Sequence, residues 1–286
     1  MGPIDVPSSP LIPKDTFKRL QNERYTEWLK VTRDWVFGGP DIAQKVGPYL
    51  IFIHSSEGSP EKHLLSRMDE VRMYGGFPVQ GGGSAVGTYR GVEIWILHQY
   101  MGCTATQMWM ECLAGTGVRY LIGLADMTAY LDHVAVGDIV LPSCATRGDL
   151  VTDFHVTADL PASADKRLLG RLEGKLGDFD WDVHVGQVYS GMPGGVGVHN
   201  PILRERIWQQ MQEGIIGNAI ETSVTYVESS RLRIRAAEAW VVSDDLSHGT
   251  VESVPGGAAQ WERAWSLMAQ AALDVFYDIA DEEGNL

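Results

Sequence analysis

Short apolar runs alternate with amphipathic segments along most of the chain. Apolar runs bounded by turn residues, which are typical of buried strands, occur at 49–54, 92–98, 118–125, 137–146, 182–190 and 237–243. Segments with apolar residues on one helical face predict helices at 14–36, 63–71, 104–117, 165–176, 201–213, 222–234 and 257–280. Residues 75–91 predict a loop or hairpin. Strands that alternate with helices predict an α/β fold, with a central mixed, mostly parallel sheet flanked by helices.

The chain has 286 residues, a length that one α/β domain commonly reaches. We interpret residues 1–46 as an N-terminal leader followed by an extra helix, and residues 47–286 as a single α/β domain. The N-terminus lacks a basic region followed by an apolar core, so a signal peptide is not expected. No apolar run approaches the roughly 20 residues of a membrane span, so a membrane partner is not expected either.

The amino-acid composition restricts which ligands and which kinds of site are expected. A net charge of −14 and a pI near 4.9 argue against a nucleic-acid partner, because phosphate binding needs a basic surface. Cys103, Cys112 and Cys144 form no CxxC pair, which argues against a disulfide framework and favours a reducing cytoplasm. The eight histidines show neither HxH nor HExxH spacing, so no metal site is predicted. A small molecule is the expected ligand, and no cofactor is expected.

Polar residues at the predicted strand ends form the candidate site, because ligands of parallel sheets bind beyond the carboxyl ends of the strands. Asp126 follows 118–125, and Asp244 follows 237–243. Each carboxylate either caps the next element or, held among apolar residues, acquires the raised pKa of a general acid. Glu221 precedes a helix, where it would be a dipole partner or would accept hydrogen bonds from a vicinal diol. Gly102 would let a ligand approach the backbone amides of a helix start.

Six segments together resemble the nucleoside phosphorylase family, in its branch of purine nucleoside and uridine phosphorylases that includes nucleosidases. They are EGSPEK, HQYMGCTATQMWMECL, LDHVAVGDIVLP, VHVGQVYSG, GNAIETS and WVVSDD. The resemblance covers most of residues 48–280. Its most specific segments are the last two, which match the family's VEMEA and VSD in order and spacing. It implies a nucleoside phosphorylase-like fold and a homo-oligomer, built as a dimer or as dimers that form a hexamer.

The resemblance also implies a role for each matching residue. Asp244 would protonate the leaving base, beside Ser243 and assisted by Arg263. Glu221 would hold the 2′ and 3′ hydroxyls of the ribose. The sugar and the base would be lined by the remaining matching residues, which are Met101, Gly102, Ile220 and Tyr189.

The phosphate site departs from the family pattern. Where the family's phosphorylases read Arg-x-Gly-Ser, this chain reads GLAD at 123–126, so glycine replaces the arginine and Asp126 replaces the serine. An anion about 4 Å from this carboxylate would be repelled by about 4 kcal/mol at an effective dielectric constant near 20. Gly58 and Lys62 would remain of the anion site, although lysine lacks the bidentate fork of arginine. The family's second acid in VEMEA is Ala219 here.

Three functions are consistent with these residues. The missing arginine favours the first, hydrolysis of an N-glycosidic bond in a nucleoside-like substrate, with Glu57 or Asp126 activating the water. The second is phosphorolysis through an anion site rebuilt on Gly58 and Lys62, with Arg72 or Arg90 as a further cation. These two would make the chain an N-glycosyl hydrolase or a pentosyltransferase. The third is a scaffold repurposed as a biosynthetic cyclase or lyase, or as a binding protein, for an apolar ligand that is not a nucleoside.

Overall fold

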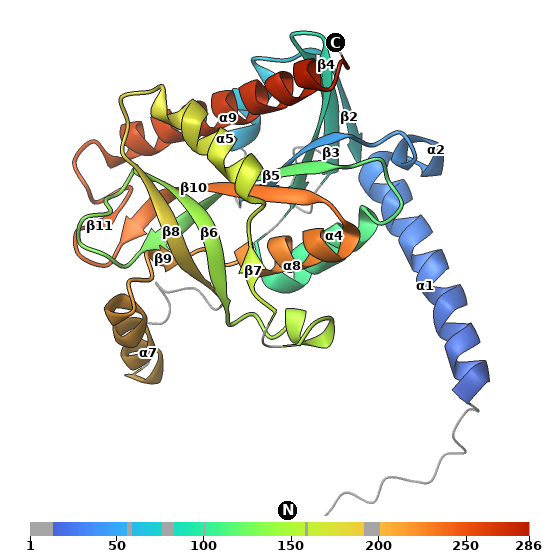
Figure 1. Cartoon of the computed structure of the whole chain (residues 1–286), viewed down its shortest axis with the longest axis horizontal. Coiled ribbons are helices and arrows are strands. Elements are labelled where there is room, and N and C mark those ends of the chain that lie inside the picture. The colour runs from blue at the N-terminus through green and yellow to red at the C-terminus, as the bar shows by residue number, and fades with distance from the viewer. Residues whose placement is uncertain are drawn as a thin grey trace, which may run out of the picture.

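The strand Tyr49–His54 (β1) shows how the apolar runs build the sheet. All six of its residues are buried, and it pairs in parallel with Val92–Gln99 (β4) on one side and Tyr120–Ala129 (β5) on the other. The computed structural model describes residues 14–55, 59–75, 83–99, 101–157, 160–191 and 201–285. Within them the strands form one mixed 11-stranded sheet, which confirms the predicted α/β class (Figure 1).

The remaining elements follow in chain order. The other strands are β2 (Asp69–Gly75), β3 (Gly83–Tyr89), β6 (Ile139–Arg147), β7 (Ala162–Ser163), β8 (Val183–Ser190), β9 (Gly217–Asn218), β10 (Arg235–Asp245) and β11 (Gly249–Thr250). The helices are α1 (Lys14–Phe37), α2 (Pro40–Ala43), α3 (Ser59–Leu65), α4 (Cys103–Cys112), α5 (Lys166–Gly177), α7 (Pro201–Gln212), α8 (Thr222–Leu232) and α9 (Gly257–Glu282), with a short 3-10 turn, η1, at Thr152–Phe154.

Five of the strands close into a ring. β10 pairs in parallel with β5 and antiparallel with β6. β6 continues through β8 and β9 back to β5. The closing strand β9 begins at Gly217, where a Cβ would lie 2.2 Å from the carbonyl oxygen of Thr128. The ring therefore depends on a backbone approach that only glycine allows, while β1, β4, β3 and β2 continue from β5 as an open sheet.

Helices cover the sheet on two sides. In Figure 1, α5 and α9 lie together above the strands, and α4 and α8 lie together below them. The long helix α9 presents an apolar stripe to the core that includes Trp265, Met268 and Phe276, all fully buried. Helix α1 packs beside β2 and β3 and then extends away from the body of the protein. Both faces of the central strands are thus covered, which explains their continuous apolar runs.

Most predicted elements are confirmed, including the N-terminal helix, but the helix predicted at 63–71 is wrong in its second half. Helix α3 ends at Leu65, and Asp69–Gly75 forms strand β2 instead. β2 lies at the edge of the sheet, is mostly exposed, and pairs antiparallel with β3. Its side chains therefore lack the alternation of a half-buried strand, and pairing with β3 decides its structure. β7, β9 and β11 have two residues each, too few for any periodic pattern.

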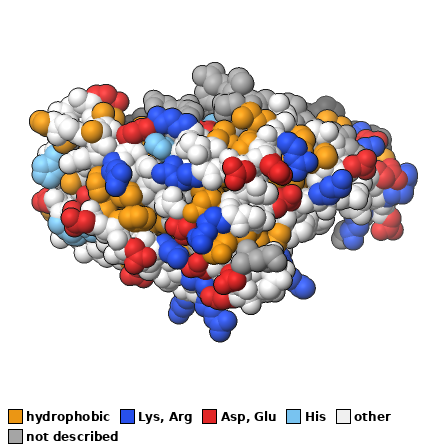
Figure 2. All heavy atoms as spheres, turned by 90° about the horizontal axis from the view of Figure 1, so that it is seen from above, with side chains coloured by type: hydrophobic (Ala, Val, Ile, Leu, Met, Phe, Trp, Pro, Cys, Tyr) orange, Lys and Arg blue, Asp and Glu red, His pale blue; other side chains and the backbone are white. Residues whose placement is uncertain are grey.

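The surface carries both signs of charge. Figure 2 shows acidic and basic side chains interspersed with apolar ones on the face that it presents, where the basic groups do not join into a continuous surface. Within the described ranges, every helix is too short or too polar to cross a membrane.

Candidate active site

An irregularity in β10 directs Asp244 to the end of β5. Along the parallel pairing of these strands, Val242 is the partner of Met127, but the register then shifts and Asp244 becomes the partner of Thr128. Partners in a ladder point to the same face of a sheet, as do residues two apart on one strand. Asp244 therefore shares a face with Thr128 and with Asp126. Bulges commonly re-aim a side chain in this way beside functional sites.

Asp244 and Asp126 line one hollow of about 240 Å³ at the carboxyl edge of the sheet. The residues that line it are Asp126, Ser243, Asp244, Thr250, Val251, Glu252 and Trp261. The Ser243 hydroxyl lies 3.0 Å from Asp244 Oδ1 and 3.2 Å from the Met127 carbonyl oxygen. Burial raises the pKa of Asp244, although hydrogen bonds from Thr128 and Ser243 oppose this. A carboxyl group that keeps its proton to higher pH is suited to general acid catalysis.

Glu221 lies at the start of α8 and is 1% exposed. Its carboxyl group makes no capping hydrogen bond to its own helix, so the dipole-partner interpretation gains no support. Instead it accepts a hydrogen bond from the amide of Gly102, the residue before α4, with an N···Oε1 distance of 2.5 Å. The preceding carbonyl, of Ile220, accepts hydrogen bonds from Cys103 Sγ at 3.2 Å and Ser190 Oγ at 2.5 Å. Two hydrogen bonds thus join the start of α4 to the start of α8, and the third joins the end of β8 to the start of α8.

The environment of Glu221 makes stability depend on pH. Its pKa is raised from 4.5 to about 8, mainly by burial and in smaller part by Glu238 and Asp126, against the opposing hydrogen bond from the Gly102 amide. Between these two pKa values the native carboxyl group keeps a proton that the unfolded chain releases, so the free energy of unfolding falls as pH rises. We predict a smaller fall for Glu221→Gln, which cannot ionise, in urea unfolding series measured across this pH range. Equal pH dependence in the two proteins would contradict the assignment.

Tyr189 lies near the end of β8, where it is the register partner of Asn218 on β9. Its pKa is raised mainly by burial, and it also responds to the charges of Cys103 and Asp149. The neighbouring Tyr130 is 1% exposed. Burial raises the pKa of Tyr130, with smaller contributions from Tyr189 and Asp244. The two tyrosines pack in one small apolar cluster with Ile207, Ile215 and Met211.

Of the two residues predicted for the anion site, Lys62 lies within the described part of the chain, and it pairs with an acidic side chain. The Lys62 ammonium lies 2.5 Å from Glu262 Oε1 on α9, and its side chain is 58% exposed. Arg263 is exposed, because it lies two positions after Trp261, and residues two apart on a helix face different directions. Met101 is 45% exposed beside Gly102. Glu57 and Gly58 lie outside the described residues.

A buried polar cluster around Glu238 was not predicted from the sequence. Glu238 is fully buried on β10 and accepts a hydrogen bond from Trp240 Nε1 at 3.0 Å. His54 at the end of β1 places Nε2 3.8 Å from Glu238 Oε1. Gln99 Nε2 lies 2.7 Å from His54 Nδ1. Two features of the sequence could have revealed this cluster: a carboxylate inside the apolar run AEAWVVS and a histidine at the end of YLIFIH. Polar residues in fully buried strands need hydrogen-bond partners.

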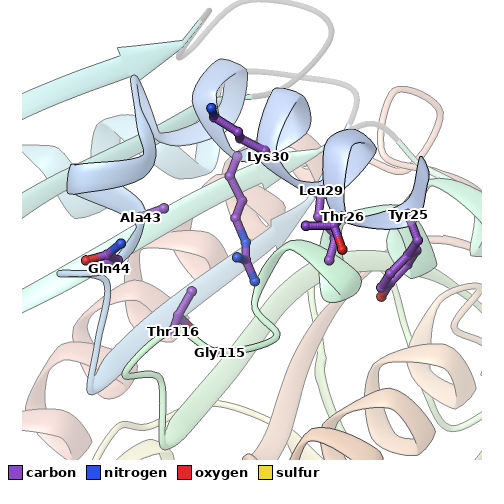
Figure 3. Close-up of a pocket in the computed structure, with 9 residues that line it drawn as sticks. Tyr25, Thr26, Leu29, Lys30, Ala43, Gln44, Gly115 and Thr116 are labelled. Atoms are coloured by element: carbon purple, nitrogen blue, oxygen red, sulfur yellow. The ribbon is translucent and has the colours of Figure 1, made fainter. Parts of the chain in front are cut away.

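A second hollow, of about 210 Å³, lies between α1, α2 and the turn that precedes β5 (Figure 3). Tyr25, Leu29 and Ala43 contribute to its walls, together with Gly115 and Thr116. Because the last two precede β5, this hollow lies at the amino edge of the sheet, opposite Asp126. Across the described parts of the chain, no group of three or more His, Cys, Asp or Glu side chains is arranged to hold a metal ion.

Comparisons with known proteins identify the family of the chain. The sequence model of the Phosphorylase superfamily matches residues 70–262, and the chain belongs to this superfamily. It is 26% identical over 103 residues to a guanosine phosphorylase from Halorubrum lacusprofundi, a match that covers 36% of this chain and 43% of that relative. The chain therefore matches less than half the length of that relative.

Solved structures share the fold. Uridine phosphorylase from Vibrio fischeri ES114, complexed with 6-hydroxy-1-naphthoic acid, superimposes with a TM-score of 0.73 at 19% sequence identity. A second structure of the same uridine phosphorylase gives a TM-score of 0.72, also at 19% identity. Each match covers 82% of this chain and 93% of the other. This likeness confirms the nucleoside phosphorylase-like fold.

Proposed function

We propose that the protein hydrolyses the N-glycosidic bond of a nucleoside-like substrate. Membership of the superfamily and the similarity to a guanosine phosphorylase support this bond as the target. The observation that carries the chemistry is the pair Asp244 and Asp126 on one hollow, with the pKa of Asp244 raised by burial. One carboxyl group that holds a proton beside a second carboxyl group supplies a general acid and a candidate base.

In the proposed reaction the bond between C1′ and the base nitrogen breaks, and its electron pair goes to the base. Asp244 donates a proton to the leaving base. Water adds to C1′ and gives its proton to Asp126, so the products are a free base and a free pentose. Leaving-group protonation of this kind typically contributes about 10²–10⁴-fold to the rate.

The sugar is proposed to lie against the starts of α4 and α8. Glu221 keeps its proton to about pH 8, so at neutral pH it can donate a hydrogen bond to one hydroxyl group of the ribose and accept one from the other, because each hydroxyl can act as donor or acceptor. Gly102, Met101 and Ile220 would line the same side. Tyr189 would stack on the base, because it packs with Tyr130 in one apolar cluster and Asp244 lies close enough to influence Tyr130.

The acidic side chains near the carboxyl half of β5 favour water over phosphate as the nucleophile. Glu221, Asp126 and Glu238 are carboxyl groups close enough to influence one another. Lys62, the cation predicted for the anion site, forms an ion pair with Glu262. An anion about 4 Å from an ionised carboxylate such as the proposed base Asp126 is repelled by about 4 kcal/mol at an effective dielectric constant near 20.

Phosphorolysis is the second candidate, and the similarity to a guanosine phosphorylase favours it. A repurposed activity on an apolar ligand, and assembly as a homo-oligomer, stay predictions from the sequence. Each of the three functions gives a different result in one assay.

We predict that purine and pyrimidine nucleosides release free base in buffer without phosphate, at a rate that added phosphate does not increase. Chromatography would separate free pentose from pentose 1-phosphate and so identify the nucleophile. Turnover only with phosphate, yielding the sugar phosphate, would replace hydrolysis by phosphorolysis. No release of base from any nucleoside, with or without phosphate, would leave the repurposed scaffold.

A further inference from the structure

The hollow between α1, α2 and the turn before β5, called here the α1 hollow, is separate from the candidate active site. Both helices precede the residues that the superfamily model matches, 70–262. Its volume of about 210 Å³ is below the roughly 300–1,000 Å³ of pockets for drug-sized ligands. Figure 3 shows side chains of α1 along one side, Gly115 and Thr116 across from them, and Ala43 and Gln44 at one end. A ligand for this space is therefore a compact molecule.

The charge of the lining is opposite to that of the whole protein. Lys30 and Arg33 lie three positions apart on α1, so they share one side of the helix. Among the nine described residues that line the α1 hollow, none is acidic, although the chain has a net charge of −14. Three acidic residues line the hollow beside Asp244 instead. A small anion is therefore attracted to the α1 hollow and repelled from the candidate active site.

Arg33 is held in place with most of its hydrogen-bond donors unused. Its Nε donates to the carbonyl oxygen of Cys112, the last residue of α4, at 3.0 Å. Its Nη2 lies 3.8 Å from the position that a Cβ would take on Gly115, so no side chain of residue 115 covers this part of the guanidinium group. Among the described residues, neither Nη group has a hydrogen-bond partner. A guanidinium group fixed in this way can bind a carboxylate through two parallel hydrogen bonds.

The other polar groups of the α1 hollow also favour a ligand that accepts hydrogen bonds. The hydroxyls of Thr26 and Thr116 each donate to a backbone carbonyl oxygen in their own segment, at 2.8 and 2.7 Å. A hydroxyl has one proton to donate, so neither has a donor left. Lys30, Arg33 and the Gln44 amide supply the side-chain donors. An ionised carboxylate, which only accepts hydrogen bonds, matches this set.

The rest of the lining is apolar. Leu29 and Ala43 contribute aliphatic surface, and Ala43 is 3% exposed. The ring of Tyr25 stacks on that of Trp28 with centroids 6.2 Å apart, and its hydroxyl is bonded to Glu111 on α4. The tyrosine ring is therefore a fixed wall, and covering these surfaces with an apolar group is favourable.

We propose that the α1 hollow binds a small monocarboxylate with a compact apolar body. The carboxylate lies on the Nη groups of Arg33, close to Lys30. The apolar body lies between Leu29, Ala43 and the ring of Tyr25. This site is additional to the proposed hydrolysis and does not depend on it. Because Tyr25 and Arg33 both contact the last two residues of α4, the bound molecule strengthens the attachment of α1 to the body of the protein.

Calorimetric titration with phenylacetate, benzoate and butyrate tests the ligand class. We expect saturable binding of phenylacetate, and binding of its neutral analogue phenylacetamide that is at least about tenfold weaker, which corresponds to about 1.4 kcal/mol. Amide hydrogen exchange with phenylacetate present should slow in residues 25–33 and stay unchanged in residues 243–245. Failure of all three carboxylates to bind, equal affinity for the amide, or protection at 243–245 in place of 25–33 would overturn the proposal.

Variants of α1 locate the carboxylate. Arg33→Gln should weaken phenylacetate binding at least about tenfold, and Arg33→Lys should recover only part of the loss, because lysine lacks the bidentate fork. Lys30→Gln leaves the contact of Arg33 with Cys112 intact and should weaken binding about two- to fivefold, as for an exposed charge. It decides the question if the Arg33 variants do not fold. Lys18→Gln is the matched control, since Lys18 is an exposed cation of α1 outside the hollow. Equal affinity in all four variants would overturn the assignment.

Inorganic phosphate separates a carboxylate site from a site for any anion. We expect phosphate to bind at least about tenfold more weakly than phenylacetate, because it has no apolar body. Phosphate binding that is tighter than that of phenylacetate and is lost in Arg33→Gln would identify an inorganic-anion site and overturn the ligand class. Release of base from nucleosides is measured separately, so hydrolysis can be refuted while these titrations still support the α1 hollow.

Discussion

Asp244→Asn is expected to lower kcat for base release by about 10²–10⁴-fold, the usual contribution of general acid catalysis. Asparagine keeps the size and one hydrogen-bonding oxygen, so it should preserve the contact with the Ser243 hydroxyl, which lies 3.0 Å from Asp244 Oδ1. It cannot donate the proton that the departing base needs. Steady-state assays at saturating nucleoside would measure the loss.

The pH profile gives an independent readout of the same substitution. Burial raises the pKa of Asp244, and the reaction needs the protonated form, so activity of the unmodified protein should fall as pH rises through that pKa. The residual activity of Asp244→Asn should lack this fall. Asp132→Asn is the control, since Asp132 is an exposed carboxylate whose partner is Ser247, just beyond β10. Full activity in Asp244→Asn would show that another group protonates the base.

Trp240→Ala is expected to lower the free energy of unfolding by about 3–5 kcal/mol, as for other fully buried aromatic residues replaced by alanine. Trp240 is 1% exposed in the middle of β10. Its ring lies nearly parallel to that of His54, with centroids 6.3 Å apart, and its Nε1 supports Glu238. The substitution therefore removes a large apolar contact and a hydrogen bond to a buried carboxyl group together. Urea unfolding followed by circular dichroism would give the difference.

Two further variants separate the contribution of the Trp240 hydrogen bond from that of its packing. Trp240→Phe retains most of the ring but loses the donor to Glu238, so its loss of stability should be smaller and should come mainly from the carboxyl group left without that bond. Trp208→Ala, on α7, removes a side chain that is 57% exposed and should change stability by no more than about 0.5 kcal/mol. If Trp240→Ala were as mild as Trp208→Ala, the packing described around β10 would be wrong.

The sequence was most informative where a segment is long and buried on both faces. β1 and α9 were predicted within two residues at each end because their apolar patterns have no competing interpretation. β2 was missed because an exposed edge strand has no alternation, and its structure comes from pairing with β3. Local patterns carry no information about a partner strand that is distant in the chain.

The candidate site shows the same contrast between residues that could be predicted from the sequence and features that depend on strand pairing. Asp244 and Asp126 were selected because they follow predicted strands, whereas the structure extends both strands beyond them, β5 to Ala129 and β10 to Asp245. Both side chains nevertheless line one hollow. The register shift that aligns Asp244 with Thr128 could not be predicted, because a bulge is a property of two paired strands. Glu238 was overlooked for the related reason that its neighbour His54 lies on β1, which is distant from β10 in the chain.

The position of β10 in the ring has a consequence for the order in which the protein can be completed. β10 lies between β5 and β6, yet it is synthesised after both of them and after α8. During translation β5 and β6 therefore each have an unpaired edge until β10 has been synthesised, and such edges readily pair with other chains. Ring closure also brings together residues as distant as Tyr120 and Arg235, and contacts between distant residues form slowly. A chain that stops before Arg235 is consequently an incomplete barrel prone to association, and the ribosome must deliver nearly the whole polypeptide before the site can exist.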